Sequence, residues 1–326
     1  MTPLLQGLVT IVLGVGGCIA YFYGANLLLD KVLFPARGPK IGRNITRANM
    51  VRPWLFLFPA LFVLGLYLAY PVVGSFWRSL YGRDGDSFIG LGNYQALFAD
   101  ETFRTAVVNN LLWVLVVPAA ATFFGLIAAQ LTDRLSWGNI AKSIIFMPMA
   151  ISFVGASLIW KFVYANDADI GLINAIRTGL GADEAVDVMQ VPFWNNFFLM
   201  VILIWIQTGF AMVILSAALR GIPEETVEAA IIDGANPFQI FFRIKVPQIM
   251  GTIVVVWTTI TFLVLKVFDI VYTMTGGNFG TQILPSYMMS YMFRDDGRAT
   301  AVAFVIMLIV LPVMVWNILQ ARKELR

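Results

Sequence analysis

Residues that commonly carry out chemistry are scarce in this sequence. Its 326 residues include no histidine, so the side chain that most often serves as a general base or metal ligand is missing. The one cysteine, Cys18, lies in an apolar stretch, so no disulfide framework can form within the chain. We therefore expect no catalytic group, no metal site and no cofactor, which leaves binding rather than bond-making chemistry.

Two apolar stretches carry amide, hydroxyl and aromatic groups that could line a path for a polar solute. They contribute Trp205, Gln207, Thr208 and Phe210 from one stretch, and Thr258, Thr259, Thr261, Phe262, Lys266 and Asp269 from the next. Lys266 and Asp269 stand three positions apart and could pair on one face of a helix. Because ionisable groups at membrane depth usually face a cavity or the bundle interior, one interpretation is that these groups line a pathway.

A structural interpretation of the same residues stays open, and the residue types alone favour it. Lys266 could extend its apolar stem and place its charge at the outer membrane surface. The threonine hydroxyls could bond to the backbone of their own helix, and Trp205 and Phe210 could simply pack between helices.

Seven windows of the sequence are apolar and long enough to cross a bilayer. Hydrophobic residues make up 59% of the chain and charged residues only 13%, whereas soluble domains carry about 25% charged residues. A crossing helix needs about 20 apolar residues, and a barrel strand would alternate polar with apolar ones. The sequence therefore predicts an all-α integral membrane protein with about seven transmembrane helices: Met1–Leu29, Trp54–Trp77, Thr105–Thr132, Ser143–Trp160, Val188–Leu219, Val246–Leu265 and Ala299–Ala321.

Lysine and arginine in the loops predict the orientation of these helices. Basic residues gather after the first window and in the C-terminal tail, namely Lys31, Arg37, Lys40, Arg43, Arg47, Arg52, Arg322, Lys323 and Arg326. With seven spans, an outside N-terminus places both groups in the cytoplasm, together with the connection around Arg134, and the loops at 78–104, 165–195 and 273–298 outside. Basic residues at the ends of apolar runs are typical of membrane topology, so we expect a lipid bilayer and no nucleic acid as partner. The first window has no basic segment before it and is expected to stay as a membrane helix.

The segment from Gly221 to Pro247 carries the signals of two short helices joined by a tight turn. Pro223 suits the first position of a helix, and Glu224 and Glu225 favour a helix N-terminus. Gly234 can adopt the left-handed conformation that ends a helix.

A second helix is predicted to begin at Asn236. Asn236 is a good N-cap, Pro237 a good first residue, and Gln239 stands at the third position of a capping box. Phe238, Phe241 and Phe242 are then available for apolar contacts. The residues equally favour a rigid cytoplasmic projection that docks on a partner and an interfacial helix pair that lies on the membrane.

The spacing within this segment resembles the EAA loop of binding-protein-dependent ABC permeases. Glu228-Ala229-Ala230 is followed by Gly234 after three residues, then by Ile244 after nine and by Val246-Pro247 after one more; the family has leucine where this chain has Val246. In that family the loop docks into a cleft of the cytoplasmic ATPase. The resemblance implies the same role here for Glu228, Ala229, Ala230, Asp233, Gly234, Ile244 and Pro247.

Other stretches are similar to sugar permeases of the maltose type, over roughly residues 52–322. They are residues 88–103 and Phe268–Gly277, while Asn278-Phe279-Gly280 and Arg294–Arg298 resemble the α-glucoside branch. The alignment implied by this resemblance places Gln207, Phe210, Phe262 and Lys266 near the family's sugar site.

The resemblance also implies the partners and the division of the chain. No phosphate-binding loop of the Walker type is present, so the expected energy source is a separate ATPase dimer. A second related permease, a periplasmic or lipoprotein solute-binding protein and a sugar substrate complete the expected set, in a bacterial inner membrane. Residues 1–52 would form an N-terminal membrane helix with a basic cytoplasmic linker, and residues 53–326 the permease domain with its coupling loop at 221–247.

Three other classes compete with this interpretation. A secondary transporter driven by an ion gradient would be expected to show paired halves and several buried carboxylates in its spans, and the sequence shows neither. An intramembrane enzyme lacks a plausible catalytic set. A membrane scaffold fits the composition but leaves the 221–247 segment without a role.

Overall fold

The computed structural model describes residues 2–35, 41–133, 135–182 and 184–324. Of the basic residues that predicted the orientation, Arg37, Lys40, Arg134 and Arg326 lie outside the described residues, as do the side chains of Arg322 and Lys323. The described part is helical, with one isolated antiparallel bridge between Tyr81 and Phe88 and no strand. The chain divides into two compact units, residues 1–74 and 75–326.

The first unit consists of two long helical segments, the second of which runs on past the unit boundary at Gly74. α1 (Pro3–Leu27) continues into a π-helical turn at Leu28–Leu33, and α2 (Ile41–Leu64) continues through a second such turn at Gly65–Ala69 into α3 (Tyr70–Ser79). Arg52 and Asp30 form an ion pair of 2.6 Å between the two segments. Nearly all of the apolar side chains remain exposed within this unit, as expected for helices that meet lipid or another subunit.

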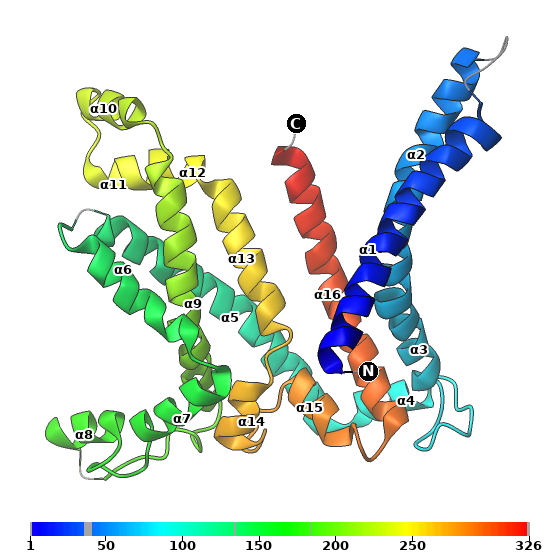
Figure 1. Cartoon of the computed structure of the whole chain (residues 1–326). Helices are drawn as coiled ribbons and strands as arrows, with labels where there is room; N and C mark the ends of the chain where they lie inside the picture. Colours follow the sequence, from blue (N-terminus) through cyan, green and yellow to red (C-terminus); the bar gives the residue numbers. More distant parts are fainter. Residues whose placement is uncertain (1, 36–40, 134, 183, 325–326) are drawn as a thin grey trace. The chain divides into compact units, whose positions relative to one another are not determined.

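The second unit holds the remaining helices. They are α4 (Gly92–Ala99), α5 (Glu101–Thr132), α6 (Gly138–Phe146), α7 (Phe153–Val163), α8 (Leu172–Gly179), α9 (Trp194–Arg220), α10 (Glu224–Ile232), α11 (Pro237–Gln239), α12 (Val246–Gln248), α13 (Met250–Val264), α14 (Asp269–Thr275), α15 (Leu284–Tyr291) and α16 (Asp296–Glu324). Figure 1 shows α10 and α11 at one end of this unit, with α4, α8, α14 and α15 at the opposite end.

Among the described residues, five helical segments are long and apolar enough to span a membrane, or up to seven if each of two bent helix pairs counts as one span. The predicted all-α membrane fold is therefore confirmed. Two of the predicted windows are bent. The fourth bends by 105° between Ala150 and Phe153, where extended Ser152 caps a new helix by accepting a hydrogen bond from the N–H of Gly155. The sixth bends by 71° at Ile249, so its straight part begins at Met250.

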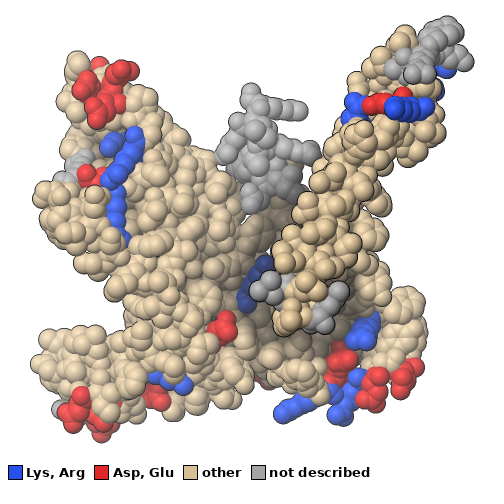
Figure 2. All heavy atoms as spheres, viewed as in Figure 1, with Lys and Arg blue, Asp and Glu red and all other residues tan. Residues whose placement is uncertain are grey.

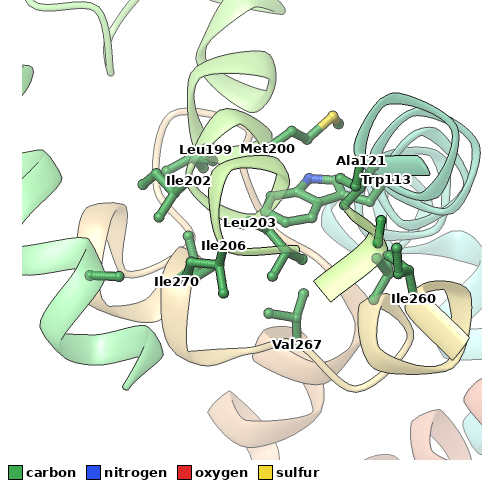
Figure 3. Close-up of a cluster of buried hydrophobic side chains, with 14 of the residues drawn as sticks. Trp113, Ala121, Leu199, Met200, Ile202, Leu203, Ile206, Ile260, Val267 and Ile270 are labelled. Atoms are coloured by element: carbon green, nitrogen blue, oxygen red, sulfur yellow. The ribbon is translucent and has the colours of Figure 1, made fainter. Parts of the chain in front are cut away.

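The core of the second unit lies where α9 crosses its neighbours. Leu199, Met200, Ile202, Leu203 and Ile206 of α9 are almost fully buried, together with Trp113 and Ala121 of α5, Ile260 of α13 and Ile270 of α14 (Figure 3). Glycines permit the close approach, because a Cβ at Gly125 would lie 2.9 Å from the backbone N of Met212, and one at Gly209 would lie 2.6 Å from the carbonyl O of Ile145.

The boundary between the compact units, after Gly74, falls inside the second predicted span rather than at residue 52. The functional division at 52/53 stays a prediction, because compactness alone does not assign a role to either part.

Candidate functional site

The residues that carry the resemblance form a compact helix pair at one end of the second unit. α10 begins at Glu224, with Glu224 and Glu225 in its first turn, where carboxylates favour the helix N-terminus. Pro223 is the N-cap, so the helix begins one residue later than the sequence predicted. Its backbone ψ of 133° is extended, whereas a first helical residue would need a helical ψ.

The turn after α10 has the left-handed geometry that the sequence predicted. Gly234 has a φ of +81°. Its N–H donates to the carbonyl O of Ile231 at 3.0 Å, and the N–H of Ala235 donates to that of Ala230 at 2.9 Å. These two hydrogen bonds satisfy carbonyl groups at the end of the helix and fix the direction in which the chain leaves α10.

The predicted capping box at Asn236 is confirmed. The side-chain O of Asn236 accepts from the N–H of Gln239 at 2.9 Å, and the side-chain O of Gln239 accepts from the N–H of Asn236 at 2.9 Å. From Pro237 the chain stays helical through α11, a π-helical turn at Ile240–Lys245 and α12. Hydrogen bonds therefore hold the turn between the two helices on both sides. The segment Glu224–Gln248 is called the coupling segment below, after the role that the resemblance implies.

The surface of the coupling segment combines carboxylates with uncovered apolar side chains. Glu228, Ala229, Asp233, Gly234 and Pro247 are exposed, Ile244 is half-buried and Ala230 is buried. Ile232 is 85% exposed and Phe238 76% exposed. Figure 2 shows acidic side chains gathered at the tip of this end of the molecule. Such a surface suits a protein partner that has an apolar cleft with basic groups around it.

The phenylalanines of the coupling segment also face a membrane-spanning helix across a pocket. Phe238, Phe241 and Phe242 line a pocket of about 380 Å³, whose opposite wall is the last part of α5 from Phe123 to Leu131. The sequence placed these rings on the segment but did not predict that they share a pocket with α5, because the pocket brings together residues more than a hundred positions apart.

A charged network that the sequence did not predict lies beside the coupling segment. Asp133, directly after α5, binds Lys142 of α6 and accepts hydrogen bonds from Ser216 Oγ at 2.9 Å and Arg220 Nε at 3.0 Å, both on α9. Burial alone would raise the pKa of Asp133, but the hydrogen bonds from Lys142, Ser216 and Arg220 outweigh it and hold the pKa below its usual value. Three helices are thus joined at the residue where α9 ends and the connection to α10 begins.

The expected pathway residues have mixed environments. Gln207 is buried, at 4% exposure, while Phe210 and Phe262 are half-buried and Thr259 is exposed. The hydroxyl of Thr259 donates to the carbonyl O of Val255 at 2.7 Å, so it bonds to the backbone of its own helix, as the structural interpretation predicted. Nothing in this geometry assigns a solute to these residues.

The expected pairing of Lys266 and Asp269 on one helix face is wrong. α13 ends at Val264 and α14 begins at Asp269, so the two residues do not share a helix. The structure has no ion pair between them, although both belong to the described part of the chain, and Lys266 is exposed.

No group of three or more Asp, Glu or Cys side chains is placed to hold a metal ion among the residues that the structure describes.

The fold is that of a permease from a bacterial ABC importer. A chain from the crystal structure of a bacterial ABC transporter involved in the import of the acidic polysaccharide alginate matches with a TM-score of 0.70 at 20% identity. The match covers 87% of this chain and 99% of that one. A second structure, in which the alginate transporter is in complex with an alginate pentasaccharide-bound periplasmic protein, matches equally well, with a TM-score of 0.70.

Sequence comparison then shows the family. The model for the binding-protein-dependent transport system inner membrane component matches residues 121–325. The alpha-glucoside transport system permease protein AglF of Rhizobium meliloti is 61% identical over 335 aligned positions, covering 99% of both chains. The osmoprotective compounds uptake permease protein GgtC of Synechocystis is 48% identical, covering 83% of this chain and all of that one. The chain therefore belongs to the binding-protein-dependent inner membrane permeases, and it is a multi-pass membrane transport subunit, as the sequence predicted.

Proposed function

We propose that this chain is the permease subunit of an ATP-driven importer of α-glucosides in a bacterial inner membrane. The observation that carries the proposal is the coupling segment with its hydrogen-bonded turn, whose two ends continue into membrane-spanning helices. α9 ends at Arg220, four residues before α10, and α13 begins two residues after α12. A partner that grips this segment would move both spans together.

The proposed partner at the coupling segment is a cytoplasmic ATPase dimer, which hydrolyses the ATP while this chain does not. The exposed Ile232 and Phe238 give the partner apolar contacts, and Glu228 gives it a charge to pair with. Closure of the ATPase dimer on ATP would draw two docked segments together and rock the attached spans between outward-open and inward-open states. The second segment would belong to a related permease, and a periplasmic or lipoprotein binding protein would deliver the sugar.

The proposed substrate follows from sequence similarity. The 61% identity to a permease named for alpha-glucoside transport extends over nearly the whole chain. Within the membrane, Gln207, Phe210, Thr259, Phe262, Lys266 and Asp269 remain the proposed pathway residues. Gln207 lies on α9 at 4% exposure, and its side-chain amide is a group that can both donate to and accept from a sugar hydroxyl.

Uptake of labelled α-glucoside by cells carrying the whole transporter tests the coupling proposal. Glu228→Lys reverses the charge on the coupling segment, so we expect uptake to fall at least tenfold while the amount of chain in the membrane is unchanged. Glu184→Lys, at a site that is also exposed and lies in the loop at the opposite end, is the matched control. Normal uptake by Glu228→Lys would refute the docking role.

The same assay separates the competing functions. Uptake that stops when ATP is depleted but survives an ionophore supports an ATP-driven importer, whereas the reverse supports a secondary transporter. If an osmoprotective compound competes for uptake and unlabelled α-glucosides do not, the substrate would instead be an osmoprotective compound, the class for which GgtC is named.

A further inference from the structure

Two helices at the end of the second unit opposite the coupling segment run across the direction of the spans (Figure 1). α7 is bent by 105° from the segment Gly138–Ala150, and that segment packs along α9. α8 follows α7 and lies at the level where α9 begins (Figure 1). An amphipathic helix that crosses the span direction at the start of a span has the orientation of a helix that lies in the membrane surface.

α8 carries an apolar stripe that no described residue covers. Leu172 and Ile176 are four positions apart, on one face of the helix, and are 57% and 54% exposed. Leu180, four positions further at the C-cap, is 84% exposed. A stripe of three large aliphatic side chains on an eight-residue helix is more than isolated surface hydrophobicity would give.

A buried asparagine fixes which face of α8 turns outward. Asn174 is fully buried, and its amide donates to the carbonyl O of Ala165 at 2.8 Å and to that of Val186 at 3.0 Å. Its own side-chain O accepts from the N–H of Val186 at 2.9 Å. Because both sides of the loop are tied to the inner face of α8, the apolar stripe cannot rotate into the core.

The stretches before and after α8 also carry acidic residues. Asp167, Asp169 and Glu184 are exposed. Figure 2 shows acidic atoms along the lower edge of the region that contains α8, which is the edge furthest from the coupling segment. A soluble partner approaching from outside would meet this acidic edge first. The aliphatic side chains of the stripe are instead stabilised by transfer from water into an apolar environment.

Two exposed aromatic residues stand at the same level, where α9 begins. Phe193 is 62% and Trp194 58% exposed, with ring centroids 5.6 Å apart. Phe193 has a φ of +68°, a conformation that bulky residues rarely adopt, and its ring remains outside the core. Aromatic rings at the start of a span are typical of the membrane–water interface.

We propose that α8 lies in the headgroup region of the lipid bilayer, with Leu172, Ile176 and Leu180 inserted among the upper acyl chains and Phe193 and Trp194 beside them. The assignment to the outer leaflet rests on the proposed orientation of the coupling segment; the insertion itself does not. Anchored in this way, α8 holds the start of α9 at a fixed depth while the other end of α9 is moved by the coupling segment.

Nitroxide depth measurements on the full-length chain test this proposal. Cys18 is the only cysteine and is exposed, so a Cys18→Ser background permits single labels at Ile176→Cys and Leu180→Cys, with Asp169→Cys and Glu184→Cys as matched controls in the same loop. The chain is reconstituted in vesicles of phosphatidylcholine and phosphatidylglycerol, and collisions with oxygen and with a water-soluble nickel chelate are compared.

We expect the ratio of oxygen to nickel collisions to be at least fivefold higher at positions 176 and 180 than at 169 and 184. Equal nickel access at all four positions would overturn the proposal. So would shielding of 176 and 180 that appears only when the soluble binding protein is added, because the stripe would then be a protein-docking surface. The measurement needs neither ATP nor transport, so its outcome is separate from that of the importer proposal.

Discussion

Asp133 is the residue on which three helices converge beside the coupling segment. It stands at the C-terminal end of α5, where the helix dipole disfavours a carboxylate, and the cations of Lys142 and Arg220 offset that cost. Its side chain is only 18% exposed, so solvent screens these interactions weakly. Asp133 therefore stabilises the junction of α5, α6 and α9 as a charged group.

We expect Asp133→Asn to destabilise the chain by about 1–3 kcal/mol at neutral pH, the usual range for hydrogen bonds to a charged group. The folded pKa of Asp133 is lowered, so its stabilising contribution is complete above the unfolded pKa and is lost as the pH falls through the folded pKa. Melting in detergent across pH measures this: the deficit of Asp133→Asn relative to wild type should shrink in acid. Asp169→Asn, at an exposed residue without an ion pair among the described residues, should melt like wild type at every pH.

Gly234 contributes to the coupling segment through its left-handed backbone conformation. A Cβ there would meet no atom within 4 Å, so any effect of substitution comes from the backbone conformation alone. We expect Gly234→Val to cost more than the roughly 1–2 kcal/mol typical of a left-handed residue with a Cβ, and Gly234→Asn to cost less. Uptake should follow the same order, with Gly179→Ala, which has open space and no positive φ, as control. Equal uptake by the Val and Asn variants would contradict the role of this turn.

At the scale of elements, the crossing of α5 and α9 holds the second unit together. The two helices approach so closely at Gly125 that a methyl group would displace the backbone of α9 near Met212. Small residues at such crossings let dispersion contacts form along both helices, which matters where no hydrophobic effect drives helix association within lipid.

We expect Gly125→Ala to destabilise the chain by about 1–3 kcal/mol through overpacking. Gly14→Ala in α1, where a Cβ would meet nothing within 4 Å, is the matched control and should have no effect on melting. A wild-type melting temperature for Gly125→Ala would mean that α5 and α9 can separate without loss, contrary to their packing in the structure.

At the scale of the whole molecule, the second unit has two chemically different ends. One carries the coupling segment, and the other carries α8 and the loops on either side of α14 (Figure 1). The charge distribution of the sequence predicts that the first end is cytoplasmic.

Labelling of intact cells with a membrane-impermeant maleimide measures this orientation. In a Cys18→Ser background, Ile232→Cys at the coupling segment should react only after the cells are opened, because its 85% exposed side chain would face the cytoplasm. Glu184→Cys at the other end should react in intact cells. The opposite result would place the coupling segment outside, beyond the reach of any cytoplasmic ATPase.

Local signals predicted local structure well. The left-handed Gly234 and the Asn236–Gln239 capping box depend on neighbouring residues only, and both are confirmed. Predictions from the sequence were wrong where they assumed that one helix continues through a whole apolar run. Lys266 and Asp269 have helical spacing, but the helix ends at Val264, and the apolar run of the fourth window conceals the 105° bend before Phe153. Hydropathy measures how apolar a run is and does not reveal where its helix axis turns.

The sequence by itself determined that the chain is a helical membrane protein with a capped helix pair between two spans, because hydropathy, charge and capping are properties of short segments. Only the tertiary structure decided which distant groups meet: Asp133 with Lys142 and Arg220, the coupling phenylalanines with α5, and α8 lying across the spans with its stripe uncovered. These contacts join separate elements, and no local pattern encodes them because they depend on how whole helices cross.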